Sequence, residues 1–232
     1  MPWLEAILTG AGGAGLAWIA GLPLGLAPAT AVIGGLNGLI SGSRAIYDWR
    51  TAGGWGGYAL DSSWGLIGTA GSLVLHLVQR VLPSGNYRKD LSRRRGRHVY
   101  EGGYRLKRSF ATTVGNVITN ADGLNGLDGA SGPRRRLLID RHEMLHVWQH
   151  RWFGPLFPAL YGGWAVVGAV GGLLVGLLTK RSVAKAIFTI AYYDNPFEYW
   201  AYRRDRYWPP SGADPSLAWR GTVEDQRTGT IL

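Results

Sequence analysis

The chain has 232 residues, of which 46% are hydrophobic, with 36 glycines, 11 tryptophans and a formal net charge of +10. This composition differs from that of an ordinary water-soluble domain and indicates contact with a membrane. The sequence has no cysteine, which excludes disulfide bonds and thiolate metal ligands. Any metal site therefore has to use histidine and carboxylate side chains.

Residues 1–79 are predicted to form Gly-rich helices that associate with a membrane. Residues 6–43 contain no charged side chain, which is enough for two short crossings or for a re-entrant hairpin. The expected turn is at Gly21-Leu22-Pro23 or near Pro28. A shorter uncharged run over 62–79 predicts an interfacial, half-inserted or buried helix.

Residues 80–98 are predicted to be a basic juxtamembrane linker. Residues 80–108 hold ten Lys or Arg side chains and only two acidic ones. Each basic residue beside an apolar segment favours anionic lipid headgroups by about 1 kcal/mol. We therefore expect anionic headgroups of a lipid bilayer along Arg88–Arg97, and we prefer this interpretation to a nucleic-acid surface.

Residues 99–208 are predicted to form a metal-binding domain. Residues 99–119 alternate in polarity as two or three strands do, with glycine-containing turns between them. A helix is expected to start at Pro133 or, with Asp140 as its N-cap, further along, and to end at Phe153 before Gly154-Pro155.

The rest of the chain is predicted to contain an apolar helical insertion, a last helix and a tail. The insertion covers 156–193, the last helix lies within 182–208, and a mobile tail follows over 209–232. Glycines recur every four residues at 34, 38 and 42 and again at 168, 172 and 176. Such spacing favours close helix packing, within the chain or, as an alternative, in a glycine-zipper oligomer.

The segment His142-Glu143-Met144-Leu145-His146 predicts a zinc site. Residues four apart lie on one face of a helix, so the imidazoles of His142 and His146 can reach one Zn²⁺ ion, and Glu143 points toward the water on that ion. A catalytic zinc ion has three protein ligands and keeps its fourth position for water. Glu198, on a later helix, is the expected third ligand.

Two other side chains, His150 and Asp194, are weaker candidates for the third ligand. His150 continues the four-residue spacing, but on a straight helix it lies about 12 Å along the axis from His142, too far for one ion. Asp194 is an acidic alternative that is less well placed than Glu198.

The H-E-M-L-H segment and the later N-P-F-E-Y-W-A segment, residues 195–201, resemble the motif helix and the glutamate helix of the zincin-like metallopeptidases of the gluzincin type. The resemblance covers roughly residues 99–208. It implies that Glu143 is the general base and that the strands of 99–119 offer an edge to an extended substrate. The chain departs from the family pattern at Asp140, where an uncharged residue is usual, and at Tyr202, where many members have Asp.

This resemblance implies a mainly α fold with a small β-hairpin region, in which a zincin-like catalytic core is seated on Gly-rich membrane helices. Since His146 and Glu198 must reach one ion, we expect residues 156–193 to fold back as an apolar helix pair. The basic loops do not indicate on which side of the membrane the site lies.

The expected function is a membrane-bound zinc peptidase that cleaves a protein or peptide substrate, alone or in a larger membrane complex. Two alternatives remain open at this point. One is a catalytically silent membrane scaffold or accessory subunit with a zincin-like fold, and the other is the glycine-zipper oligomer.

Overall fold

The computed structural model describes residues 2–82, 85–107, 109–123, 126–127 and 131–219. It is mainly helical, as predicted, and in place of the predicted small β-hairpin region of two or three strands it has a small four-stranded sheet of mixed direction. The chain divides into two compact units, Met1–Pro155 and Leu156–Leu232.

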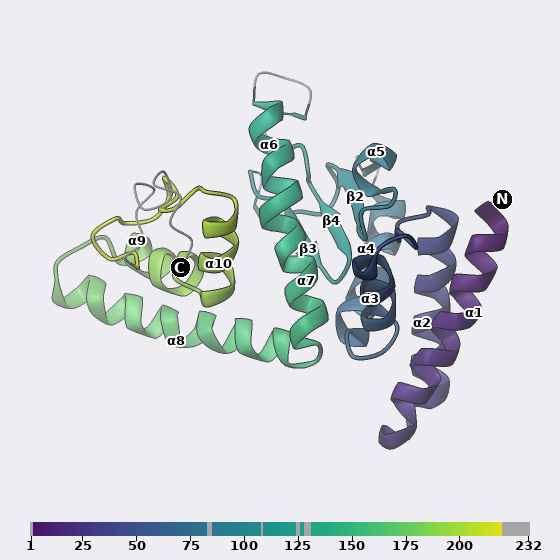
Figure 1. The fold of residues 1–232 in the computed structure, drawn as a ribbon. Coiled ribbons are helices and arrows are strands. Elements are labelled where there is room, and N and C mark those ends of the chain that lie inside the picture. Colours follow the sequence, from purple (N-terminus) through teal and green to yellow (C-terminus); the bar gives the residue numbers. More distant parts are fainter. Residues whose placement is uncertain (1, 83–84, 108, 124–125, 128–130, 220–232) are drawn as a thin grey trace. The chain divides into compact units, whose positions relative to one another are not determined.

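The first unit opens with a helical hairpin (Figure 1). Its elements in chain order are α1 (Pro2–Gly21), the short turn η1 (Leu22–Leu24) and α2 (Ala27–Ser43). The turn falls at Gly21-Leu22-Pro23, one of the two predicted positions. Gly38 lies so close to α1 that a Cβ atom there would come within 2.7 Å of the carbonyl carbon of Thr9. The glycines of α2 therefore serve packing within the chain.

Two shorter helices follow, and the second of them buries mostly polar side chains. They are α3 (Ala52–Asp61) and α4 (Leu66–Val81). The buried face of α4 carries Thr69, Ser72 and Gln79, whereas Val74 and Leu77 are exposed. This arrangement reverses the usual pattern of a helix in water.

The small sheet lies beside these helices in the order β1-β2-β4-β3. The strands and the helical turn between the first two are β1 (Asn86–Tyr87), α5 (Lys89–Ser92), β2 (His98–Glu101), β3 (Thr112–Val114) and β4 (Val117–Thr119). Strand β2 runs parallel to β4, and β3 and β4 form a hairpin closed at Gly115-Asn116, one of the predicted turns. Gly115 has a φ of +56°, which glycine adopts at little cost.

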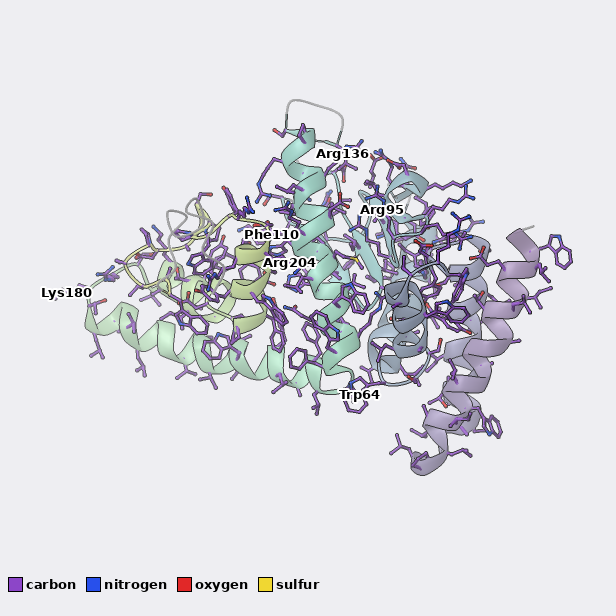
Figure 2. The ribbon with its side chains drawn as sticks, in the orientation of Figure 1. Trp64, Arg95, Phe110, Arg136, Lys180 and Arg204 are labelled. Carbon is purple, nitrogen blue, oxygen red and sulfur yellow. The ribbon has the colours of Figure 1, made fainter. Side chains whose placement is uncertain are left out.

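The segment predicted as a basic linker contains β1, α5 and the start of β2. Arg97 is only 2% exposed and donates to the carbonyl oxygens of Leu91 and Ile139. The expectation that Arg97 meets lipid headgroups is therefore wrong, because its guanidinium holds two backbone segments together. Arg93, Arg94 and Arg95 are exposed, and Figure 2 shows Arg95 beside α5.

The predicted motif helix is one continuous rod in Figure 1, where its two α-helical parts are labelled α6 and α7. The parts are α6 (Gly132–Leu138), the π-helical turn η2 (Ile139–Glu143) and α7 (Met144–Phe153). The early start at Pro133 is confirmed, and Asp140 as N-cap is wrong because it lies inside the rod. Gly154, with a φ of +49°, ends the helix as predicted.

The rod packs on the sheet through an apolar cluster. Ile139 and Val147 of the rod meet Val99 of β2 and Ile118 of β4. Burial of such side chains contributes about 1.5–3 kcal/mol each. The face of the rod that carries Ile139 and Val147 is therefore fixed against the sheet.

A buried ion pair joins the rod to the helices of the first 79 residues. Arg151 of α7 donates two hydrogen bonds of 2.8 Å to the carboxylate of Asp61 on α3, and both side chains are buried. Tyr47 and Asn116 donate to the same carboxylate. Burial, followed by the negative charge of Asp61, raises the pKa of Tyr47 above its usual range, so its hydroxyl remains a donor.

The second unit consists of one long helix and a shorter return. Its elements are α8 (Leu156–Leu178), α9 (Val183–Phe188), the π-helical turn η3 (Thr189–Tyr193) and α10 (Pro196–Arg204). Lys180 lies in the turn beyond the end of α8 (Figure 2). Gly168, Gly172 and Gly176 face the returning segment closely. The predicted fold-back of 156–193 is confirmed, with the turn near Lys180.

The predicted single last helix within 182–208 is broken at Asp194-Asn195. Residues 209–219, which were expected to begin a mobile tail, pack on the unit, since Ala213 and Trp208 share a buried cluster with Tyr193 and Tyr202. The remainder of the predicted tail, 220–232, lies outside the described residues.

Among the described residues, two segments are long and apolar enough to cross a membrane. They are Trp3–Leu24 and Leu156–Leu178. Most of their side chains are not buried within the protein, since only 28% of the most apolar 18-residue stretch of the first segment and 17% of that of the second are buried. Length and composition therefore permit a membrane location.

We expect Arg151→Met to lower the free energy of unfolding by about 3–5 kcal/mol, because it leaves the Asp61 carboxylate buried without its cation. Denaturant unfolding in detergent, followed by tryptophan fluorescence, measures this change. Arg181→Met, which removes an exposed arginine 3.5 Å from Asp214, is the matched control with a much smaller expected loss. Equal losses in the two variants would contradict a special role for the buried pair.

We also expect stability to fall as the pH drops below about 6.5, in part because of His98. Burial, with smaller contributions from His76, Arg44 and Arg151, keeps the pKa of His98 well below 6.5. The His98 side chain takes up a proton near pH 6.5 in the unfolded chain but not in the folded chain. The free energy of unfolding therefore falls by at most about 1.4 kcal/mol per pH unit. His98→Gln should flatten the decline in melting temperature between pH 7.5 and 5. An unchanged slope would refute this assignment.

Candidate metal centre

The two histidines of the motif are placed by the π-helical turn and the α-helix that follows it. His142 lies in η2 and His146 in α7, and both are buried. Their Nε2 atoms face each other at 3.2 Å. Two nitrogens bound at 2.0–2.1 Å to one tetrahedral zinc ion lie about 3.3 Å apart. The spacing of the two imidazoles therefore fits a shared metal ion.

The tautomer of His146 is set by Gln149, one turn further along α7. The Nδ1 atom of His146 lies 2.7 Å from Oε1 of Gln149. An amide oxygen can only accept a hydrogen bond, so Nδ1 carries the proton and Nε2 keeps its lone pair. An outer contact of this kind orients a metal-binding histidine and strengthens it as a ligand. Gln149 is thus the partner that the sequence did not identify.

Glu143 is held by the neighbouring strand. Its Oε2 atom accepts a hydrogen bond of 2.6 Å from the hydroxyl of Thr113 on β3, and its side chain is buried. Strand β3 is the outer strand of the described sheet next to β4. This contact joins the expected general base to the strand that was predicted to receive substrate.

In the second unit, Glu198 lies in the first turn of α10. Asn195 caps that helix, because its Oδ1 accepts from the backbone N–H of Phe197 at 3.1 Å and Pro196 occupies the first turn. The hydroxyl of Tyr161 on α8 donates to Oε1 of Glu198 at 2.7 Å. The cap and Tyr161 together fix the carboxylate.

His142, His146 and Glu198 form a buried group that could hold a metal ion, since one ligand atom of each lies within 4.8 Å of the others. The group has the three members predicted from the sequence. Neither His150 nor Asp194 belongs to it. Asp194 instead accepts a hydrogen bond from the backbone of Trp219, and burial raises its pKa to about 6.

The two departures from the family pattern have structural explanations. Asp140 forms ion pairs with Arg97 and Arg95, so its charge secures the rod to the segment before β2. Tyr202 packs with Trp208 in an aromatic cluster. An acidic residue at position 202 would be expected to accept a hydrogen bond from the second ring nitrogen of a metal-binding histidine. In this chain Gln149 accepts that hydrogen bond from His146 instead.

The side chains that support the site, Gln149, Thr113 and Tyr161, lie outside both motif segments. Gln149 could have been found from its position three residues after His146, which places it on the same helix face. Thr113 and Tyr161 carry no such local signal, because they are distant in sequence from Glu143 and Glu198.

Compared with known protein families, curated proteins and solved structures, the chain matches none. The resemblance to gluzincins therefore rests on the motif segments alone.

We expect Gln149→Leu to weaken zinc binding about 10–100-fold, because it removes the acceptor that fixes the His146 tautomer. Competition with a fluorescent zinc chelator measures the dissociation constant. Gln149→Glu should retain binding, since a carboxylate accepts the same hydrogen bond. His150→Gln, one helical turn beyond His146, should also bind zinc normally. Loss of binding in His150→Gln would show that the ligand set is different.

Proposed function

We propose that the protein is a membrane-associated, zinc-dependent peptidase in which His142, His146 and Glu198 hold the metal and Glu143 is the general base. The observation that carries this proposal is the three-residue ligand group next to a fourth, non-ligating carboxylate. His-His-Glu is a ligand set of zinc peptidases, and the nitrogen and carboxylate donors suit Zn²⁺.

The number of ligands favours a catalytic over a structural site. Structural zinc ions are enclosed by four protein ligands, whereas catalytic ones have three and an open position. Among the residues that the structure describes, the group contains three members. This count supports turnover over a silent zinc-binding scaffold.

The chemistry divides between the metal and the side chains around it. When bound, zinc supplies Lewis acidity that lowers the pKa of water and polarises a carbonyl group. Glu143 takes the proton of the attacking water and delivers it to the amine that leaves, as a general base and then a general acid. Thr113 donates to one carboxylate oxygen of Glu143 and leaves the other for that proton.

The placement of β3 supports a peptide as the substrate. An extended peptide that adds to the outer edge of β3 would pair with the strand that carries Thr113. Since Thr113 contacts Glu143 at 2.6 Å, the scissile bond of such a peptide would lie next to the general base.

The exposed side chains support a location in or on the bilayer. The helices α1, α4 and α8 expose apolar residues such as Ile19, Leu77 and Val167, whereas polar side chains such as Ser41 and Asp61 are buried. Exposed apolar surface of this extent marks contact with lipid or with another protein, and membrane proteins turn polar groups inward. A substrate near the membrane follows from this arrangement.

The glycine-zipper oligomer is less well supported than the peptidase. The Gly38 face of α2 meets α1, and the Gly172 face of α8 meets α9. Both small-residue faces are thus used within the chain and do not supply the surface that an oligomer of this kind requires.

We expect one zinc ion per chain in detergent-purified protein, lost in His146→Ala and in Glu198→Ala. Metal analysis by mass spectrometry measures this content. In the same samples, Glu143→Gln should retain zinc but reduce cleavage of a casein panel by about 10²–10⁴-fold, because the general base is removed.

The outcomes separate the candidate functions. Protein without zinc would refute the site itself. If the wild type contains zinc but cleaves neither soluble nor membrane-anchored peptides, the silent scaffold would be favoured. Zinc retained in Glu198→Ala would exclude Glu198 as a ligand.

A further inference from the structure

The first unit contains an apolar groove far along the chain from the metal ligands. It has a volume of about 550 Å³ and runs along the first three turns of α1, within the range of about 300–1,000 Å³ found for small-molecule sites. Its apolar walls come from Leu4, Leu8, Trp49, Trp55 and Tyr58. The metal centre and its reaction make no use of this groove.

The polar atoms of the aromatic wall are already engaged in hydrogen bonds. Tyr58 donates to the carbonyl oxygen of Thr9 at 2.9 Å, and Trp55 donates to that of Trp49 at 2.9 Å. The indole of Trp49 donates to Oε1 of Glu5 at 2.8 Å. The ring surfaces therefore remain for an occupant, and they suit a hydrocarbon chain rather than a polar ligand.

One side of the groove is basic. Glu5, the charged residue of its lining, is bound by Arg94, whose Nη2 lies 2.8 Å from Oε2. Arg93 precedes Arg94 in sequence and is exposed, whereas Arg95, which follows it, pairs with Asp140. The groove thus combines an apolar channel with Arg94 at its edge and the exposed Arg93 next to it in sequence.

The position of the groove along α1 gives its depth in a membrane. Residues 3–24 are a candidate span, and the groove lies against the first half of that segment. Tryptophan side chains prefer the headgroup level of a bilayer, which places Trp49, Trp55 and the neighbouring arginines where lipid phosphates lie.

We propose that this groove binds one anionic phospholipid, with an acyl chain along Leu4, Leu8 and the aromatic wall and the phosphate against Arg94. Charge complementarity identifies the occupant, because Arg93 and Arg94 together carry one more positive charge than Glu5, which a zwitterionic lipid or a detergent would leave without a counter-charge. Glu5 competes with the phosphate for Arg94. This lipid site is independent of the metal centre, and of the proposed function it requires only the membrane location.

Native mass spectrometry of the full chain in detergent, titrated with dioleoyl phosphatidylglycerol or dioleoyl phosphatidylcholine, tests this site. We expect one phosphatidylglycerol to bind at least about fivefold more tightly than phosphatidylcholine. Arg94→Gln should weaken phosphatidylglycerol about fivefold, and Glu5→Gln should strengthen it, since Arg94 is then free for the phosphate.

Occlusion of the groove tests the acyl chain separately. Leu8→Trp should lower the affinity for the lipid at least about tenfold. An acyl chain that buries two fewer methylene groups in the groove already loses about that much affinity. The matched control is Ile19→Trp, since Ile19 and Leu8 are almost equally exposed on α1, 64% and 63%, and Ile19 lies outside the groove. Arg80→Gln is the control for loss of one positive charge elsewhere.

Two results would overturn the proposal. Equal binding of the two lipids would remove the anionic headgroup from the site. Equal affinity of Leu8→Trp and Ile19→Trp would show that lipid binds elsewhere on the apolar surface. Neither result bears on zinc content, so failure here is distinguishable from failure of the peptidase.

Discussion

The ion pair between Asp61 and Arg151 is the constraint on which the first unit depends. It joins α3 to α7 across 90 residues of sequence, and Tyr47 and Asn116 donate to the same carboxylate. Charges removed from water remain ionised in a protein only when their partners are complete. The pair therefore sets how the rod that carries both histidines lies against the helices of the first 79 residues.

This constraint also explains why an apolar chain contains so many buried polar side chains. Asn116 bridges Asn37 of α2 to Asp61, and Ser41 lies 3.1 Å from the ring of His98 on β2. The hydrogen bonds between these buried side chains join parts of the chain that are far apart in sequence. Helices α2 and α3 and the sheet thus share one buried polar network.

At the candidate metal centre, rigidity comes from local contacts on both sides of the candidate ligands. Gln149 fixes the tautomer of His146, Thr113 holds Glu143, and the cap at Asn195 sets the first turn of the helix that carries Glu198. Each contact removes a rotational freedom that would otherwise be lost when a metal binds. Ligands arranged in this way are prepared for an ion.

The sequence by itself determined the motif helix, its end at Gly154 and the placement of His142 and His146 on one face of that helix, because helix periodicity and glycine turns are local properties. It also predicted the fold-back after α8. Only the tertiary structure decided that Arg97 is buried, that β1 and α5 replace a linker, and that Thr113 and Tyr161 support the two glutamates. These contacts join residues far apart in the chain, and no local spacing encodes them.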